Sequence, residues 1–247
     1  MTQAPTPSMV YDIIEASTRP GCPLCRVSRR WGERFMAAIL YEEVTDPHTR
    51  GRLKESFGFC REHAWQAADV GGTLLGMSII YRGLLNQVGA ALAQATPQAQ
   101  ARWWQKFGSK SDEERGRAAP GLAAQSECPA CLQLRDLERT ALVALTEALP
   151  GNERLRAGLS GPDKGFCLPH LRQALALAPT PEAFAFLQQS TLSRLEALGA
   201  EMEEFIRKYD HRFNKEEWGS ERDSWQRAIA WVAGGTIPDT RGPAADA

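Results

Sequence analysis

The chain has 247 residues, and its 29 lysines and arginines face 30 aspartates and glutamates, for a formal net charge of −1. Hydrophobic residues make up 43% of the chain and charged residues 24%, which excludes an intrinsically disordered protein. A pI near 6.5 argues against a broadly basic surface, so a nucleic-acid partner is not expected.

The N-terminal segment has neither a positively charged start nor an apolar stretch, so we expect no secretory signal. The longest near-continuous apolar run, residues 70–80, is far shorter than the roughly 20 residues that cross a bilayer. We therefore expect a cytoplasmic protein without a membrane span. In that compartment, paired cysteines bind metals or react in redox chemistry more often than they form structural disulfides.

The first half of the chain carries a CPLC motif at residues 22–25 and a GFCREH motif at residues 58–63. Between them, apolar residues recur every three or four positions, which predicts a helix directly after the first motif. That helical face consists of Leu24, Val27, Trp31, Phe35 and Ile39. A second, longer helix is expected from about residue 76 to residue 95.

The second half repeats this order with CPAC at residues 128–131 and GFCLPH at residues 165–170. The offset between the halves is 106 positions for the CxxC pair and 107 for the CxxH pair, so the chain is an internal duplication. Thr180 and Pro181 form a helix start, with threonine as the N-cap and proline as the first helical residue. The apolar face of that helix continues to Tyr209.

No segment shows a sustained period-two pattern, so the predicted fold is all-α. It comprises two pseudo-symmetric helical halves, each with a Cys3His zinc site, and a C-terminal helical extension. The predicted boundaries are an N-terminal repeat over residues 9–107, a polar linker over 108–127 and a second repeat over 128–209. The extension covers residues 210–234, and residues 235–247 form a loose tail.

The cysteines and two of the histidines supply thiolate and imidazole donors, which suit tetrahedral zinc. We expect two zinc ions per chain, each between two helix N-termini, whose partial positive charge and free N–H groups stabilise thiolates. Pro23 and Pro129 favour helix starts directly after the first cysteine of each CxxC motif. Because four protein donors leave no open position, a structural role is favoured over a catalytic one. The predicted metal ligands are Cys22, Cys25, Cys60, His63, Cys128, Cys131, Cys167 and His170.

Two other segments carry polar or aromatic side chains that suit a functional site. Asp210, His211, Arg212 and Glu216 follow the long second-half helix and would form a polar site if their side chains converged, but a C-terminal helix cap is the favoured explanation. The pair Trp103–Trp104 could stack on bases or lie on a membrane surface, but such a pair more often packs on a short helix.

The duplicated CPxC and GFCxxH motifs, the KYDHRF segment at residues 208–213 and a tryptophan-bearing terminal helix resemble a family of bacterial helical proteins of unknown function. The resemblance covers residues 9–234 and matches at all eight ligand positions. It implies a bacterial, cytosolic protein with paired metal sites. It implies no activity.

Three functions therefore remain open from the sequence. The first is a non-enzymatic, zinc-stabilised interaction or adaptor protein with a protein partner. The second is a redox sensor in which oxidation of the thiolates releases zinc. The third is an enzyme that uses the polar segment around His211.

Overall fold

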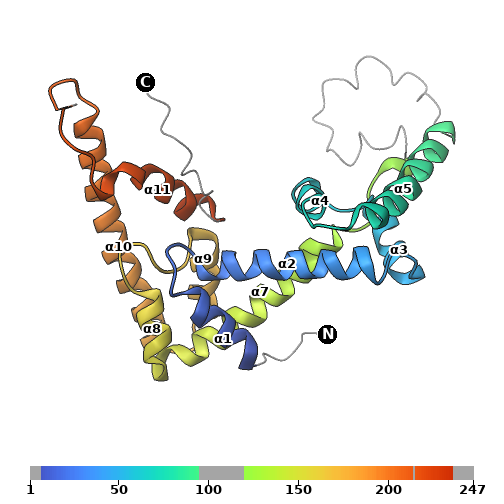
Figure 1. The fold of residues 1–247 in the computed structure, drawn as a ribbon. Coiled ribbons are helices and arrows are strands. Elements are labelled where there is room, and N and C mark those ends of the chain that lie inside the picture. The colour runs from blue at the N-terminus through green and yellow to red at the C-terminus, as the bar shows by residue number, and fades with distance from the viewer. Residues whose placement is uncertain (1–6, 95–119, 214, 236–247) are drawn as a thin grey trace, which may run out of the picture. The chain divides into compact units, whose positions relative to one another are not determined.

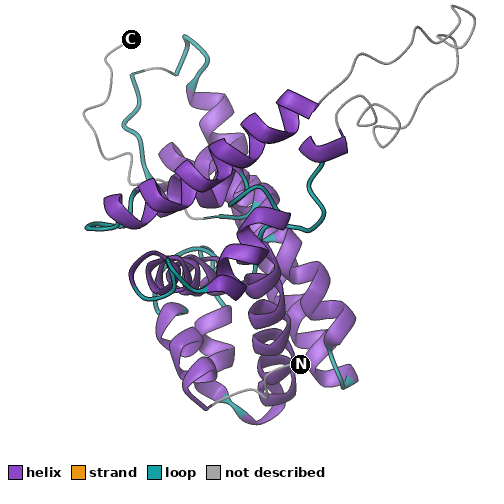
Figure 2. Cartoon of the chain, turned by 90° about the vertical axis from the view of Figure 1, so that its right-hand side faces the viewer, coloured by secondary structure: helices purple, strands orange, loops and turns teal. Residues whose placement is uncertain are grey.

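The structure, a computed structural model, describes residues 7–94, 120–213 and 215–235 (Figure 1). Within these ranges the chain consists of helices and loops, and its one β-type pairing is an isolated bridge between Gly21 and Lys164 (Figure 2). The predicted all-α fold is thus confirmed.

The helices are α1 (Pro7–Ala16), α2 (Pro23–Tyr41), α3 (Pro47–Glu55), α4 (Arg61–Ala68), α5 (Leu74–Gln94), α7 (Pro129–Ala148), α8 (Glu153–Leu159), α9 (Leu168–Leu177), α10 (Pro181–Lys208) and α11 (Ser224–Ala233). Short 3-10 turns are η3 (Pro120–Leu122), η4 (Leu149–Gly151) and η5 (Ser220–Asp223).

The duplication is visible in the order and starting points of the helices. Helix α2 begins at Pro23 and α7 at Pro129, and α3 begins at Pro47 and α8 at Glu153. Each of these starts is shifted by 106 positions, and the starts of α4 and α9, and of α5 and α10, are shifted by 107. The additional residue therefore lies between the starts of α8 and α9. Helices α1 and α11 flank the duplicated part.

Local sequence explains where these helices begin. Proline is the first residue of α2, α7 and α10, where its fixed φ fits and its missing N–H costs nothing. Ahead of α10, the Thr180 side chain accepts a hydrogen bond from the backbone N–H of Ala183 over 3.2 Å. The N-cap predicted for this helix is therefore confirmed, and the predicted first-half counterpart is present as α5.

The chain divides into two compact units, but not at the boundaries of the sequence repeats. Unit 1 consists of Met1–Arg30 and Arg135–Ala247, and unit 2 consists of Trp31–Leu134. Both boundaries fall inside long helices, α2 and α7. Each unit therefore combines parts of both repeats. Most of the predicted linker, residues 108–119, lies outside the described residues.

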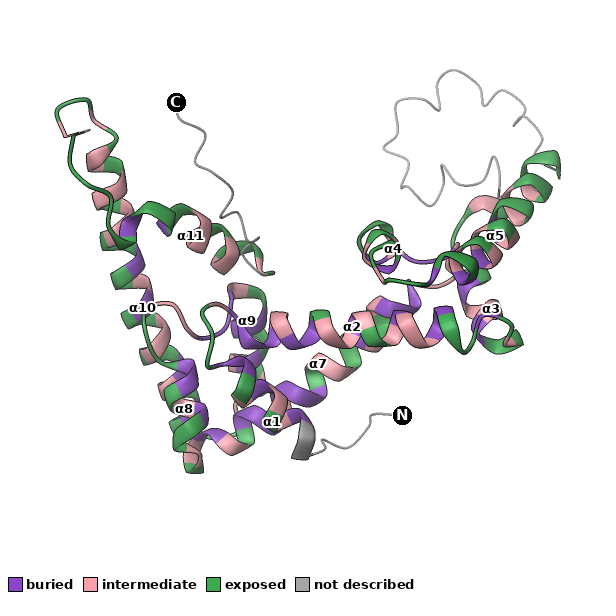
Figure 3. Cartoon of the chain, viewed as in Figure 1, coloured by how far each residue is buried: buried purple, intermediate pink, exposed green. Residues whose placement is uncertain are grey.

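Each unit has its own apolar core, and buried residues alternate with intermediate and exposed ones along the helices (Figure 3). The core of unit 1 includes Ile13, Leu24, Leu142, Leu145, Leu149, Leu155 and Leu187. The core of unit 2 includes Met36, Ile39, Leu40, Leu53, Phe59, Ile80 and Leu84. Among the described residues, no helix is both long and apolar enough to cross a membrane.

Candidate metal centre

The structure gathers the eight predicted ligand residues into two groups of three cysteines and one histidine. In each group the donor atoms lie within 4.8 Å of one another. Cluster I consists of Cys22, Cys25, Cys167 and His170, and cluster II consists of Cys60, His63, Cys128 and Cys131. Cluster I belongs to unit 1 and cluster II to unit 2.

The grouping corrects the expectation that each half carries a site of its own. Each cluster joins the CxxC motif of one repeat to the CxxH motif of the other. The reason is the length of the helix between the motifs, since α2 spans 19 residues and α7 spans 20. At about 1.5 Å per residue, each of these helices carries the chain roughly 28–30 Å away from its own CxxC before the CxxH follows.

The GFC part of each CxxH motif has a specific backbone role. Gly58 and Gly165 have φ values of 90° and 109°, a left-handed region that residues with a Cβ avoid. The following phenylalanines, Phe59 and Phe166, are buried with 7% and 4% exposure and anchor the turn in the core. This turn delivers the next residue, a cysteine, to the N-cap of α4 or α9.

Four helices therefore begin at the two clusters. Helices α2 and α9 start at cluster I, and α7 and α4 start at cluster II. Helix N-termini carry partial positive charge and unpaired N–H groups, which favour thiolates at these positions. The predicted arrangement of two helix N-termini at each ligand group is confirmed.

The donor distances in cluster I are a few tenths of an ångström shorter than the edges of a tetrahedron around a bound zinc ion. In cluster I, Nδ1 of His170 lies 3.4, 3.3 and 3.2 Å from the sulfurs of Cys22, Cys25 and Cys167. The sulfurs of Cys25 and Cys167 are 3.5 Å apart. Zinc bond lengths of about 2.3 Å to sulfur and 2.0–2.1 Å to nitrogen imply edges of about 3.6–3.8 Å.

Cluster II has the same form. Nδ1 of His63 lies 3.2, 3.3 and 3.7 Å from the sulfurs of Cys60, Cys131 and Cys128. The sulfurs of Cys60 and Cys131 are 3.7 Å apart. None of the six cysteines forms a disulfide. Both groups could therefore hold a metal ion through three thiolates and one imidazole.

Several thiols cannot ionise together in such a space unless a cation neutralises them. Hydrogen bonds with Cys167 and Cys22, together with burial, raise the pKa of Cys25. Burial and the neighbouring sulfur of Cys60 raise the pKa of Cys131 to about 12. A divalent cation would supply the charge that lets these sulfurs ionise, and thiolate–imidazole sets prefer soft or borderline metals such as zinc.

Cluster I has an additional polar group behind its histidine. Nε2 of His170 lies 3.6 Å from Oε2 of Glu138 on α7, within ion-pair distance. The other oxygen of Glu138 accepts a short hydrogen bond from the hydroxyl of Ser28 on α2. Burial raises the pKa of Glu138, but hydrogen bonds with His170 and Ser28 outweigh it and lower the pKa overall. An ionised carboxylate thus faces the ring nitrogen that points away from the sulfurs.

The C-terminal helix brings backbone to the same cluster. The N–H of Gly235 donates to the sulfur of Cys25 over 3.3 Å. The preceding residue, Gly234, has a φ of 79°, and a Cβ there would lie 3.5 Å from the sulfur of Cys167. That distance is ordinary van der Waals contact, so it is the positive φ values of Gly234 and Gly235, 79° and 95°, that favour glycine where the chain passes the sulfurs at the end of α11.

The polar segment after α10 does not form a convergent site in the structure. His211 is 89% exposed and contacts Asp210, which also forms an ion pair with Arg212. Glu216 instead pairs with Arg207. The arrangement is a helix cap, so it does not support the hypothesis of an enzyme using these four residues.

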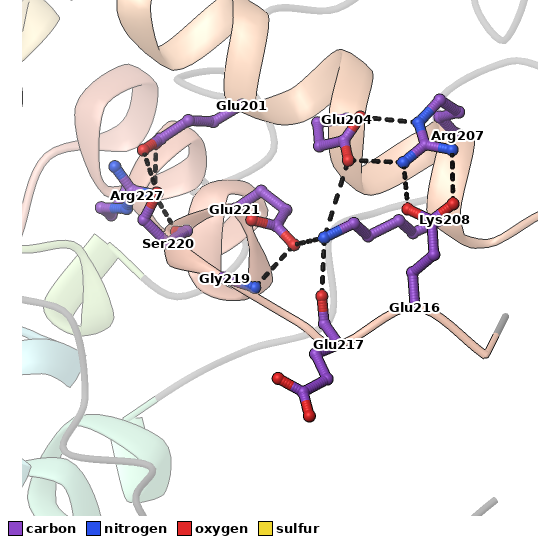
Figure 4. A network of polar contacts seen from close by, with 10 residues as sticks. All are labelled: Glu201, Glu204, Arg207, Lys208, Glu216, Glu217, Gly219, Ser220, Glu221 and Arg227. Atoms are coloured by element: carbon purple, nitrogen blue, oxygen red, sulfur yellow. Dashed lines mark hydrogen bonds and ion pairs between the residues drawn. The ribbon is translucent and has the colours of Figure 1, made fainter. Parts of the chain in front are cut away.

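A network of ion pairs closes the turn between α10 and α11 (Figure 4). Lys208 contacts the carboxylates of Glu204 and Glu221 and the backbone carbonyl of Glu217. Nearby, Arg227 of α11 contacts Glu201 of α10. The segment that follows the second repeat thus fastens α11 onto α10.

Sequence reasoning missed four residues around cluster I. Glu138, Ser28 and Gly235 contact its ligands or each other, and the buried Arg194 donates to the carbonyl of Phe166, directly before Cys167, over 3.1 Å. Only Glu138 carried a sequence signal, because its carboxylate stands four residues after the buried Leu134 and three before the buried Ala141, on the apolar face of α7. The pair Trp103–Trp104 lies outside the described residues.

Among the comparisons with known proteins, only the one with family models gives a match. No curated protein and no solved structure matches it. The model of one family matches residues 9–239, which is nearly the whole chain and includes all the cluster residues. The chain therefore belongs to the family of unknown function DUF6062.

Proposed function

We propose that the chain is a zinc protein that binds two ions, and that each ion fastens one repeat to the other. The observation that carries this proposal is the convergence of eight donors into two four-donor clusters, each built from both repeats. With three thiolates and one imidazole, each ion would have no open coordination position. Closed sites of this kind are structural.

On this proposal, the protein acts as a zinc-stabilised interaction or adaptor protein with a protein partner. Several large apolar side chains of α5 remain exposed, among them Leu74 at 78%, Leu75 at 73% and Leu85 at 70%. Exposed apolar side chains gathered on one element are typical of surfaces that contact other proteins. The six reduced cysteines favour a reducing compartment, and a cytoplasmic location is part of the proposal.

The test is the metal content and stability of the purified full chain. Native mass spectrometry should give two zinc ions per chain, and removal of zinc by a chelator should lower the melting temperature. A ratio well below two, or a melting temperature that the chelator leaves unchanged, would overturn the proposal.

A second candidate function is a redox sensor, favoured by the three cysteines that are only half-buried, Cys25, Cys60 and Cys131. Two adjacent thiolates would give two electrons to one molecule of hydrogen peroxide and form a disulfide. The peroxide would take up these electrons and two protons and become two water molecules. The ion would then lose two ligands and dissociate. Zinc release at micromolar peroxide would support this function, and stable zinc binding under those conditions would contradict it.

A further inference from the structure

The two clusters share their ligands but differ in what surrounds them. The inference below rests on the proposed function, since it concerns how firmly the two zinc ions would be held. The internal duplication makes the comparison direct, because the positions around one cluster that lie within the duplicated part have equivalents around the other.

The first difference concerns the group that faces the ring nitrogen of the histidine that points away from the sulfurs. Ten positions after the first cysteine of the CxxC motif, the second repeat has Glu138 and the first repeat has Gly32. Six positions after that cysteine, the first repeat has Ser28 and the second has Leu134. The hydrogen-bonded pair at cluster I is thus replaced at cluster II by a glycine and a leucine.

The structure confirms that these positions are equivalent. Ser28 contacts Glu138 at cluster I, and a Cβ on Gly32 would lie 3.3 Å from the side chain of Leu134 in unit 2. The same Cβ would lie 3.5 Å from the side-chain amide of Gln66, so an amide occupies space near the missing carboxylate. No carboxylate can come from residue 32 itself.

The charge and orientation of Glu138 matter for metal binding. A carboxylate on the outer nitrogen of a ligating histidine fixes its tautomer and raises its basicity toward the metal. Removal of such an outer group typically costs 10–100-fold in metal affinity. Ser28 holds Glu138 in place, so both residues position His170 without touching the ion.

The second difference is the cover over the thiolates. Cluster I has one half-buried cysteine, Cys25, and the N–H of Gly235 donates to its sulfur. Cluster II has two half-buried cysteines, Cys60 and Cys131. A donor on a thiolate lowers its tendency to accept a proton or react, and cover by backbone hinders a chelator.

The third difference is the support of the cysteine in the CxxH motif. Arg194 of α10 is 8% exposed and donates to the carbonyl that precedes Cys167. At the offset of 107 positions, the equivalent residue of α5 is Gln87, which carries no charge. A buried guanidinium near the sulfurs of Cys22 and Cys167 also offsets the negative charge of three thiolates.

From these three differences we infer that the two clusters hold zinc with different kinetic stability. Cluster I retains its ion as a structural link between the repeats, and cluster II is the site from which zinc exchanges. Glu138 and Ser28 are positioning residues for cluster I. Any response of this protein to zinc supply or to a thiol-directed oxidant starts at cluster II, in unit 2.

The test follows zinc release from the full chain loaded with two ions to an excess of a chromogenic zinc chelator, whose absorbance reports each released ion. Release should occur in two phases of one ion each. Labelling with N-ethylmaleimide during the reaction, followed by peptide mass spectrometry, should modify Cys60 and Cys131 in the fast phase and Cys25 in the slow phase.

Variants connect the slow phase to the proposed residues. Glu138→Gln should accelerate the slow phase about 10–100-fold and leave the fast phase unchanged. Ser28→Ala should act in the same direction with a smaller effect. Glu147→Gln, an exposed change on the same helix, is the matched control and should alter neither phase. The unchanged fast phase also shows that each variant is folded.

Release of both ions in one phase, earlier labelling of Cys25 than of Cys60, or equal acceleration of both phases by Glu138→Gln would overturn the inference. These results would leave the proposed function intact, because the chain would still bind two zinc ions. A chain that binds fewer than two ions would overturn both.

Discussion

The sulfur of Cys25 lies 3.5 Å from the sulfur of Cys167, although the two residues belong to different sequence repeats and are 142 positions apart. The same crossing occurs between Cys60 and Cys131, whose sulfurs are 3.7 Å apart. Each bound ion would therefore hold together segments that the sequence keeps far apart. Long closed loops are where such a link restricts the unfolded chain most.

The crossed pairing can be tested by zinc stoichiometry in double variants. Cys22→Ser with Cys167→Ser removes two ligands from cluster I only, so the chain should retain one zinc ion. Cys22→Ser with Cys60→Ser removes one ligand from each cluster and should lower the content of both ions. Metal analysis distinguishes the two results, and the reverse pattern would mean that the repeats bind zinc separately.

Loss of a single ligand should reduce stability and zinc content together. Cys60→Ser leaves three donors in cluster II, and a structural zinc site contributes folding free energy directly. We expect a loss of about 3 kcal/mol, which lowers the melting temperature of a chain of this size by roughly 6–12 °C. Calorimetry with parallel metal analysis is the measurement. An unchanged melting temperature with one lost ion would argue against a structural role for cluster II.

The end of α11 should protect cluster I. Truncation of the chain after Ala233 removes Gly235, whose N–H donates to the sulfur of Cys25. We expect faster alkylation of Cys25 and faster zinc release from cluster I. Cys60 and Cys131 serve as the internal control, because their labelling rates should not change. Equal rates for Cys25 in both chains would mean that this contact does not shield the sulfur.

Arg227 should be the strongest single ion-pairing residue of α11. It is 12% exposed and contacts Asp163, Glu201 and Asp223. Arg227→Ala leaves these carboxylates without their shared cation, and we expect a loss of about 1–3 kcal/mol in the free energy of unfolding. Urea unfolding measures it. Arg212→Ala is the control, since Arg212 is 67% exposed and its pair with Asp210 should contribute nothing measurable.

The turn between α10 and α11 should make the protein sensitive to acid. Lys208 and the N–H of Gly219 lower the pKa of Glu221 to about 2. Since this pKa lies below the ordinary glutamate value, the contribution of Glu221 is complete above about pH 4.5 and is lost as the pH falls toward 2. Unfolding measured across this range should therefore show a steeper loss of stability in the native chain than in Glu221→Gln. Identical slopes would contradict the role of this ion pair.

Much of this protein followed from the sequence. Motif spacing predicted the duplication and the eight ligand residues, and the lack of a sustained period-two pattern predicted the all-α fold. Periodicity placed the starts of α2, α7 and α10, where proline and an N-cap define the first turn within a few residues. All of these features depend on interactions between near neighbours along the chain.

The pairing of the ligands and the difference between the clusters were decided only by the tertiary structure. The helical face from Leu24 to Ile39 already indicated the long helix that lies between Cys22 and Cys60 in the chain. The order of the motifs in the sequence nevertheless suggested that the CxxC and CxxH motifs of each half bind the same zinc ion. The contact between Glu138 and His170, and the approach of Gly235 to Cys25, join residues far apart in the chain. Such contacts depend on how separate helices pack, and no local pattern encodes that.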